Sequence, residues 1–376
     1  MPFLRHTRRA CLALAAALAL AAQQSVPQTV YPGKDWERIA VPESAGYSRE
    51  RLEALRAYVG TLDTTGLVVV LGGRVLFEYG DITRLSYLAS VRKSVLAMLY
   101  GNYVTGGKIK LEKTLAELGM SDHGGLLEVE QRATVEHLIT ARSGVYHPAS
   151  NSGDSTALAP ARGSQKPGSY FLYNNWDFNA AGAAFERMTG KDIYEALETD
   201  LARPIGMQDF DRLRQRKSGD LQRSLYPAYH MWLSTRDMAR LGYLMLREGA
   251  WEGRQVIPRE WAQRIVRLVT PLRELYPVED RETSLGSGRL WGYGYMWWVW
   301  DSPANRGPFA GAYTGIGAVG QYITVLPARG LVIAHKTDPE QPAAGAAVEK
   351  PRRRNVSMTE YQVVLAMLEA ARRSRP

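Results

Sequence analysis

The sequence is nearly free of cysteine, since Cys11 is the single cysteine among 376 residues. One thiol cannot build a disulfide framework, a cysteine-rich zinc site or an iron–sulfur cluster. Histidine is also scarce, with 6 residues, and no two of those beyond the leader have metal-ligand spacing. We therefore expect neither a metal nor an organic cofactor.

The chain also lacks a concentrated charge of one sign and a long apolar run. Its 47 basic and 38 acidic residues give a net charge of +9, which is modest for this length and does not predict nucleic-acid binding. The longest apolar run, Cys11 to Ala22, is shorter than the roughly 20 residues that a membrane-spanning helix needs. No stable membrane anchor is predicted.

Residues 1–22 have the pattern of a secretory signal peptide. Arg5, Arg8 and Arg9 precede the apolar run, which ends in small residues, so we expect cleavage near Gln23 and a periplasmic or secreted protein. The Arg8-Arg9 pair loosely matches a twin-arginine signal, although paired arginines are common in ordinary signal peptides. Losing these three arginines would leave a mature charge of 9 − 3 = +6.

Strand patterns lie at both ends of the mature chain and helical patterns lie between them. The clearest element is a hairpin in which 67–71 and 74–79 are strands joined by Gly72-Gly73. Further strands are expected at 292–300, 311–314, 321–326 and 331–335, and helices at 48–61, 90–104, 133–142, 175–189, 192–202, 235–248, 258–269 and 359–373. The order predicts a discontinuous α/β lobe, 30–105 with 285–373, enclosing a helical lobe, 106–284. Pro339–Pro351 is expected to be a loop.

The first candidate for chemistry is Ser90-Val91-Arg92-Lys93, an S-x-x-K pattern that opens an apolar helix. Three residues along a helix rise roughly 4.5 Å and return to nearly the same face, so the Lys93 amine can reach the Ser90 hydroxyl. Burial would lower the pKa of the lysine toward that of a useful base. The alternative is an exposed lysine and a serine that only caps the helix.

The second candidate is Tyr173-Asn174-Asn175, at the start of the helix that runs to Gly190. The Tyr173 hydroxyl could relay protons and the Asn175 amide could hold both the lysine and a substrate carbonyl. A buried tyrosine followed by an asparagine cap would explain the same three residues.

The third candidate is the glycine-rich strand that contains Tyr313-Thr314-Gly315-Ile316. Small residues allow a substrate to lie along a strand edge, where a main-chain N–H could contribute to an oxyanion hole. The stretch Gly315–Gly320 also fits the dinucleotide pattern G-x-G-x-x-G, but it leads into a strand, whereas that fingerprint must open a helix. A nucleotide site is therefore not expected.

In order and spacing, these three motifs resemble the serine β-lactamase and penicillin-binding-protein-like superfamily. The likeness is greatest to its class C branch, which includes D-Ala-D-Ala peptidases, family VIII carboxylesterases and 6-aminohexanoate-dimer hydrolases. The segments 137–144, 204–207 and 234–240 also look like landmarks of that superfamily. The resemblance covers about 45–370 and implies an α+β fold, with an antiparallel sheet flanked by helices plus an inserted helical lobe.

The resemblance implies a role for each candidate. Ser90 would be the acylated nucleophile, Lys93 its activating partner, Tyr173 the general base and acid, and Asn175 a residue that orients substrate. The Ser90 N–H and a strand N–H near Ile316 would form the oxyanion hole. Whether Lys93 or Tyr173 takes the first proton stays open, because two such close groups titrate as a coupled pair.

One departure from the superfamily narrows the expected substrate. Tyr313 stands where β-lactamases and peptidases usually have Lys or His, so a cation for a substrate carboxylate is missing. We therefore expect small esters or amides as substrates. The alternatives are a D-Ala-D-Ala carboxypeptidase or β-lactamase, with peptidoglycan stem peptides as partners, and a catalytically silent peptidoglycan-binding module.

Three further features have both a functional and a structural interpretation. Arg142 could supply the missing cation or be an exposed loop residue, and Tyr229-His230 could face the active site or only precede a helix. The aromatic residues of 291–300 could line a substrate pocket, but their alternation favours core packing.

Overall fold

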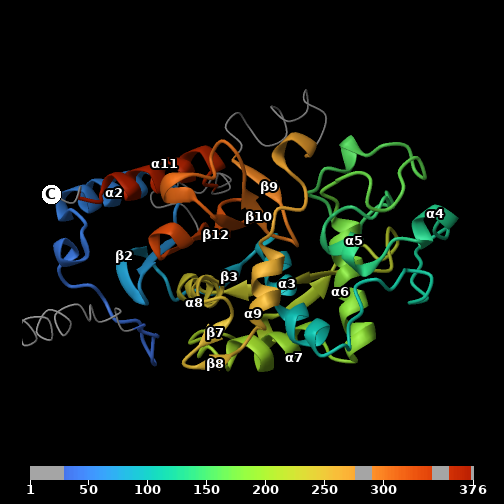
Figure 1. The fold of residues 1–376 in the computed structure, drawn as a ribbon, viewed down its shortest axis with the longest axis horizontal. Helices are drawn as coiled ribbons and strands as arrows, with labels where there is room; N and C mark the ends of the chain where they lie inside the picture. Colours follow the sequence, from blue (N-terminus) through green and yellow to red (C-terminus); the bar gives the residue numbers. More distant parts are fainter. Residues whose placement is uncertain (1–28, 276–289, 341–354, 374–376) are drawn as a thin grey trace, which may run out of the picture. The chain divides into compact units, whose positions relative to one another are not determined.

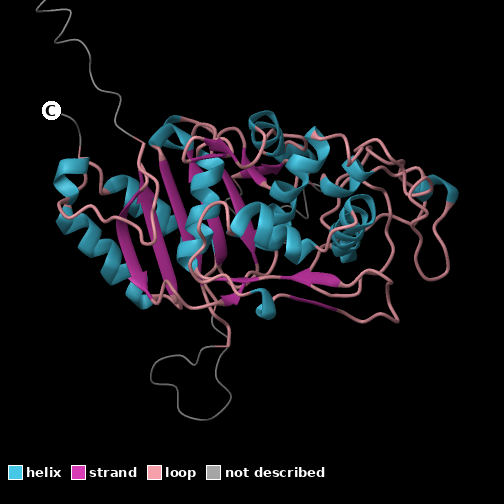
Figure 2. Cartoon of the chain, turned by 90° about the horizontal axis from the view of Figure 1, so that it is seen from below, coloured by secondary structure: helices cyan, strands magenta, loops and turns pink. Residues whose placement is uncertain are grey.

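The computed structural model describes residues 29–275, 290–340 and 355–373, and from Tyr31 on these form one compact unit. Its centre is a seven-stranded sheet in which every neighbouring pair of strands is antiparallel. The strand order is β2 (Arg74–Gly80), β1 (Gly66–Leu71), β13 (Leu331–Lys336), β12 (Gln321–Leu326), β11 (Tyr313–Gly317), β10 (Trp298–Trp300) and β9 (Trp291–Tyr293). Figure 2 shows these strands side by side with helices around them.

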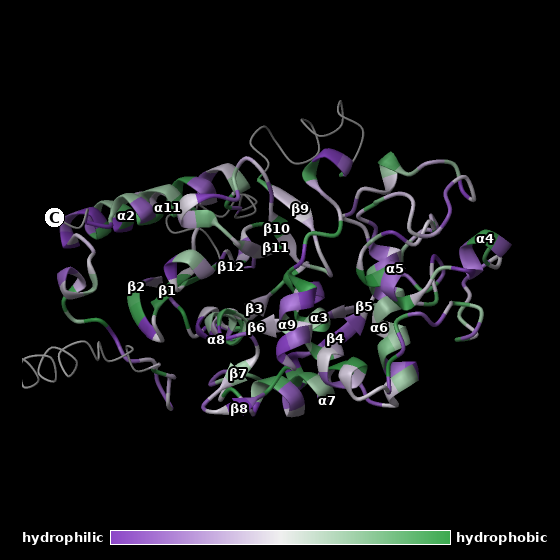
Figure 3. Ribbon diagram, viewed as in Figure 1, coloured by the Kyte–Doolittle hydropathy of each residue, from purple (hydrophilic) through white to green (hydrophobic). Residues whose placement is uncertain are grey.

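Strands from early and late parts of the chain pair with each other in this sheet, where β1 and β13 are the second and third strands. β1 pairs with β2 through a turn in which Gly72 and Gly73 have φ of 57° and 86°, a conformation that glycine adopts without steric cost. The other edge of β1 pairs with β13, where Val68 lies opposite Ala334. All of Leu67 to Val70 is fully buried, and Figure 3 shows the hydrophobic character of this hairpin.

Side chains that alternate along β12 cover two faces of the sheet. On one face, Tyr322 stacks on Tyr361 of α11 (Met358–Ala370), which lies beside α2 (Arg49–Thr61) (Figure 1). On the other face, Ile323 packs close to Gly242 of α8 (Thr235–Leu246). α3 (Val91–Thr105) lies on this second face, against β11.

In the sequence, most of the remaining elements lie between α3 and β9. The α-helices are α4 (Glu128–Gln131), α5 (Val135–Ile139), α6 (Asn175–Thr189), α7 (Ile193–Ala196) and α9 (Arg259–Ile265), and Leu197–Ala202 continues α7 as a π-helix. Two-stranded sheets are formed by β3 (Ser86–Tyr87) with β6 (Trp232–Leu233), β4 (Arg216–Ser218) with β5 (Ala228–His230), and β7 (Ala250–Trp251) with β8 (Arg254–Gln255). Short 3₁₀ turns occupy Pro42–Ala45, Thr156–Leu158, Arg212–Arg214, Leu272–Glu274, Gly307–Phe309 and Pro327–Arg329.

The predicted fold class is confirmed, as are the hairpin and the helix that ends at Gly190. Two strand predictions were wrong in their limits. The segment 292–300 is two strands, since Gly294 N donates to Trp297 O and the chain turns at Met296, where φ is 59°. The strand expected at 311–314 runs instead over Tyr313–Gly317.

Some predictions lie partly or wholly outside the described residues. The leader, 1–22, and most of the Pro339–Pro351 loop belong to this group. The boundaries of the two lobes stay a prediction. Within the described part of the chain, no helix has the length and apolar character needed to cross a bilayer.

Candidate active site

Ser90 lies at the turn that begins α3. The preceding residue, Ala89, has φ of 47°, a left-handed conformation that is uncommon for a residue with a side chain. Val91 N donates to Leu88 O at 3.2 Å and Lys93 N donates to Ser90 O at 3.0 Å, which starts the helix at the serine. Strained turns of this kind often hold reactive side chains, and Ser90 remains partly exposed while α3 behind it is buried.

Lys93 lies one turn along α3 and is only 1% exposed. Its Nζ donates to Tyr173 Oη at 2.7 Å and to Asn175 Oδ1 at 2.8 Å. The same atom lies 4.1 Å and 4.2 Å from the ring centroids of Tyr173 and Phe178. The amine is therefore held by two polar groups among aromatic rings, and the predicted meeting of Lys93, Tyr173 and Asn175 is present.

Burial is the main reason why the pKa of Lys93 lies well below that of a free lysine. The charge of Arg92 lowers this pKa further, whereas the Asp154 carboxylate opposes the shift. A buried ammonium loses hydration that the surrounding rings replace only in part. Lys93 is thereby prepared to accept a proton.

Tyr173 and Asn175 reach the lysine from the start of α6. Asn174 caps this helix by accepting a hydrogen bond from Asp177 N at 2.8 Å. Asn175 is fixed from both sides, since its N donates to Asp154 Oδ2 at 2.7 Å and its Nδ2 donates to Ser152 O at 3.0 Å. These contacts turn the Asn175 carbonyl oxygen toward Lys93.

β11 contacts the beginning of α3 at a glycine that sequence reasoning missed. A Cβ atom placed on Gly317 would lie 3.1 Å from Ser90 N and 2.6 Å from Leu88 O, so only glycine fits there. Gly315 lies two residues earlier on the same face of the strand, and its Cβ position is close to Ser94 Oγ. The second glycine of Gly315-Ile316-Gly317 was the signal in the sequence that could have indicated this contact.

The edge of β11 is open beside this contact. The ladder between β10 and β11 ends at Trp298 and Thr314, and no other described strand pairs with this edge beyond them. Trp300 N donates to Ala312 O, so the main-chain groups of Ala312, Thr314 and Ile316 point toward this edge in alternation. Ile316 therefore directs its main-chain N–H toward this open edge, and its role in an oxyanion hole stays a prediction.

The other residues of the third motif lie inside the sheet. Tyr313 is buried against Trp297, with ring centroids 5.4 Å apart, and burial raises its pKa above the ordinary value. Thr314 Oγ1 accepts a hydrogen bond from Trp300 Nε1 at 3.2 Å and lies 3.1 Å from Thr324 Oγ1. The structure thus gives Tyr313 and Thr314 neighbours in the core, and Ile316 directly precedes Gly317, which contacts the Ser90 turn.

Arg142 and the Tyr229-His230 pair have structural contacts. Arg142 Nε donates to Gly168 O at 2.9 Å, and its Nη1 donates to Thr270 Oγ1 at 2.8 Å, so this arginine ties two loops together. His230 Nδ1 is hydrogen-bonded to Tyr87 Oη at 2.8 Å. Burial and the charges of Arg92 and Arg216 lower the pKa of His230 to about 4, which leaves the ring neutral at neutral pH.

Arg92 is a second residue that sequence reasoning missed. Its side chain is 2% exposed, with the guanidinium 4.3 Å from the centre of the Tyr229 ring and Nη2 donating to Asn179 Oδ1 at 3.2 Å. None of the carboxylates in the described part of the chain forms an ion pair with it. A buried cation thus follows Ser90 by two residues and directly precedes Lys93.

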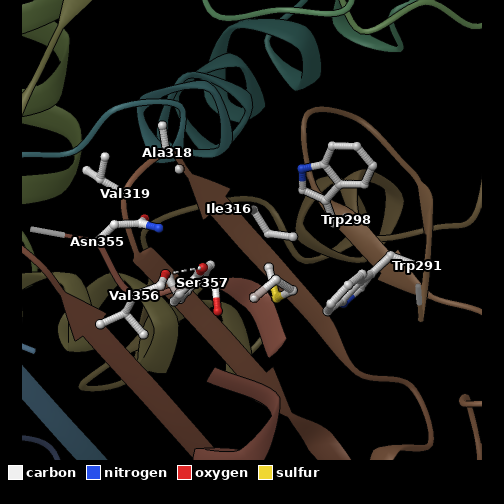
Figure 4. A pocket seen from close by; sticks show the side chains of 11 residues that line it. Trp291, Trp298, Ile316, Ala318, Val319, Asn355, Val356 and Ser357 are labelled. Atoms are coloured by element: carbon white, nitrogen blue, oxygen red, sulfur yellow. Dashed lines mark hydrogen bonds between the residues drawn. The ribbon is translucent and has the colours of Figure 1, made fainter. Parts of the chain in front are cut away.

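A cavity of about 320 Å³ adjoins the open edge of β11 (Figure 4). We call it the Trp298 pocket; its apolar walls include Trp291, Trp298, Ile316, Val319, Tyr322 and Met358, and Asn355 and Ser357 add polar groups. Trp291 and Trp298 come from the aromatic run of 291–300, and all the aromatic residues of that run, these two included, are buried. Gly317 also lines this pocket.

No group of metal-ligating side chains occurs within 29–275, 290–340 and 355–373. The site combines a serine at a strained helix start, a buried amine bound to a phenol, and an open strand edge with an adjacent cavity.

A family model and several solved structures are similar to this chain. The family model described as Beta-lactamase matches residues 56–357. A proposed 6-aminohexanoate-dimer hydrolase from Bacillus anthracis is similar in structure, with 19% identity and a TM-score of 0.59 over 91% of this chain and 86% of that one. A β-lactamase from Mycobacterium bovis has 18% identity and a TM-score of 0.56 over 85% and 97%. At these identities the likeness supports the fold.

Two further similarities are more distant or shorter. A penicillin-binding-protein homologue from Caulobacter crescentus has 17% identity and a TM-score of 0.55, over 78% of this chain and 93% of that one. An uncharacterized protein from Alkalihalophilus pseudofirmus is 28% identical over 108 residues, which is 27% of this chain and 29% of the relative. The match thus spans less than a third of that curated relative.

Proposed function

The chain belongs to the β-lactamase family and is a serine hydrolase, and on this premise we propose that it cleaves small esters or amides through an acyl-enzyme on Ser90. The observation that carries this proposal is the contact of 2.7 Å between Lys93 Nζ and Tyr173 Oη at the start of α3 and α6. It joins a buried amine to a phenol beside the helix turn that presents the serine.

In the first half of the reaction, Ser90 Oγ attacks the carbonyl carbon and its proton passes to the Lys93–Tyr173 pair. The carbonyl oxygen becomes an oxyanion, which the Ser90 N–H and a strand N–H can stabilise. The candidates on the strand are Ile316, which faces the open edge, and Ala318, which follows the close contact at Gly317. The bond to the leaving group then breaks, and the pair returns the proton to the departing oxygen or nitrogen.

In the second half, water attacks the acyl carbon and the same pair accepts its proton. Collapse of the second intermediate returns that proton to Ser90 Oγ and releases the carboxylic acid. Every proton that leaves a nucleophile is returned to a leaving group, so the cycle needs no co-reactant except water.

A side-by-side assay with p-nitrophenyl esters, a chromogenic cephalosporin and a D-Ala-D-Ala peptide tests this proposal. We expect ester turnover well above turnover of the cephalosporin and the peptide. Faster cephalosporin or peptide cleavage would favour a β-lactamase or a carboxypeptidase. Absence of all three activities would favour a silent binding module.

We further propose that residues 1–22 direct export and that the mature enzyme is periplasmic or secreted. This rests on the pattern of Arg5, Arg8 and Arg9 before the apolar run. N-terminal sequencing of protein recovered from the periplasm or the medium should find a new terminus near Gln23. Recovery of the full leader in a cytoplasmic fraction would contradict the proposal.

A further inference from the structure

The Trp298 pocket is connected to the proposed active site through two of its walls. Gly317 lines the pocket and also contacts the Ser90 turn, where its Cβ position lies 3.1 Å from Ser90 N. Trp298 lines the pocket and packs against Tyr173, with ring centroids 5.5 Å apart. A substrate whose carbonyl carbon is beside Ser90 can therefore extend into this pocket over the open edge of β11.

The position of Tyr173 indicates which part of the substrate enters. In the proposed mechanism the Lys93–Tyr173 pair returns a proton to the leaving group, so the leaving group lies on the Tyr173 side of the carbonyl. Trp298 is the pocket wall that contacts Tyr173. The part of the substrate that enters the pocket is therefore its alcohol or amine part.

The residues that line the pocket determine which kind of leaving group can bind there. Indole and aliphatic side chains, Trp291, Trp298, Ile316 and Met358, form most of its walls, and none of the lining residues in the described part of the chain carries a charge. A carboxylate moved into such a site would lose its hydration with no cation to replace it. A cavity of about 320 Å³ is large enough for an aromatic ring system.

The helix that begins beside the pocket offers no compensation for a negative charge. Ser357 N and Ser357 Oγ both donate to Glu360 Oε2 at 2.7 Å, and Glu360 N donates to Ser357 Oγ at 3.3 Å. The positive end of α11 is therefore already occupied by a carboxylate from its own first turn. A second carboxylate in the pocket would be repelled by Glu360.

We propose that the Trp298 pocket binds the leaving group of the substrate and selects an uncharged aromatic or branched alkyl group over one that carries a carboxylate. This inference deepens the proposed function and rests on it for the assignment of the leaving group. It identifies the preferred substrates as esters or amides of apolar alcohols or amines. The aromatic walls supply the contact area, and Asn355 at the rim is the exposed polar residue.

The kinetic test compares 2-naphthyl acetate with 6-carboxy-2-naphthyl acetate, which share an acyl group and differ in the charge of the leaving group. We expect kcat/KM to favour the uncharged ester by at least about tenfold, after correction for hydrolysis without enzyme. Ile316→Lys and Asn355→Lys each place a cation at the pocket and should reduce this preference by about tenfold. Val363→Lys adds the same charge at an exposed position of α11 outside the pocket and should leave the preference unchanged.

A binding measurement makes the test independent of turnover. The Ser90→Ala protein is titrated calorimetrically with 2-naphthol and with 6-hydroxy-2-naphthoate, and we expect the naphthol to bind at least about tenfold more tightly. Asn355→Lys in the same background should reduce that difference, and this rim position is exposed enough to accept lysine if Ile316→Lys fails to fold.

The outcomes separate the two proposals. Equal or reversed preference in both measurements, or a preference that neither lysine variant alters, overturns the assignment of the pocket. Selective binding of naphthol without hydrolysis of either acetate supports the pocket and contradicts the proposed function.

Discussion

Lys93 Nζ lies 2.7 Å from Tyr173 Oη, although 80 residues separate them in the sequence. α3 carries the amine and the residues preceding α6 carry the phenol, and the contact brings both to the Ser90 turn. Lys93 is buried among aromatic rings and an asparagine carbonyl. Desolvation there raises the free energy of its charged form, so the neutral amine is favoured.

Replacing Lys93 by Met should reduce kcat/KM for p-nitrophenyl acetate by about 10²-fold to 10⁴-fold, because the proton acceptor is lost. The melting temperature should change little or rise, since methionine fills the same space without burying an amine. Lys336→Met is the matched control, because Lys336 is equally buried but donates to Ser86 O and Leu233 O. This control should lose stability and keep its kcat/KM; the opposite pattern would show that Lys93 is only structural.

Replacing Arg92 by Met should move the acid limb of the kcat/KM profile to higher pH. The enzyme needs the neutral Lys93 amine, so activity rises as the pH passes the pKa of Lys93. Removing the Arg92 cation makes the lysine ammonium less unfavourable and raises that pKa. Arg56→Met provides a control, because Arg56 also lies over an aromatic ring, that of Phe77, but at the surface. An unchanged acid limb in Arg92→Met would remove Arg92 from the electrostatics of the site.

Replacing Asp154 by Asn should move the acid limb of the kcat/KM profile in the opposite direction, to lower pH. The Asp154 carboxylate stabilises the Lys93 ammonium, so its loss lowers the pKa of the lysine. Asparagine can still accept the hydrogen bond from Asn175 N, which keeps the start of α6 in place. The pH dependence of kcat/KM provides the measurement, and a shift toward higher pH would contradict the assigned sign.

Replacing Gly317 by Ala should reduce kcat/KM by about 10²-fold or more, as expected when an oxyanion donor is displaced. The new Cβ would lie 2.6 Å from Leu88 O, so the strand or the Ser90 turn must move. Gly33→Ala is the control, since no atom lies within 4 Å of its Cβ position. If Gly317→Ala folds and retains wild-type kcat/KM, the strand does not contribute to the oxyanion hole as described.

The sequence predicted the parts of this molecule that local patterns specify. Gly72-Gly73 requires a tight turn, and Asn174 with Gly190 defines the two ends of α6, so these elements agree with the structure. The S-x-x-K spacing placed Ser90 and Lys93 on one helix turn. Bringing Tyr173 to the same place depends on how α6 packs on α3, and this contact was anticipated through family resemblance.

What the sequence did not reveal depends on contacts between distant segments. Gly317 is defined by Leu88 O and Ser90 N, which no pattern within β11 indicates. The break between β9 and β10 follows from Tyr295 N bonding to Ile265 O and from Ser94 Oγ donating to Met296 O. The alternating aromatic residues of this segment are equally consistent with one continuous strand, which explains the wrong prediction.

The most direct test of the account is covalent labelling of Ser90. The full-length protein and its Ser90→Ala variant are incubated with an alkyl fluorophosphonate, which loses fluoride when a serine oxygen attacks phosphorus, and intact masses are measured. We predict one phosphonyl adduct on the wild-type protein, located at Ser90 by peptide mapping, and none on the variant. An adduct that persists in Ser90→Ala, or a wild-type protein that hydrolyses esters without being labelled at Ser90, would contradict the assignment of the nucleophile.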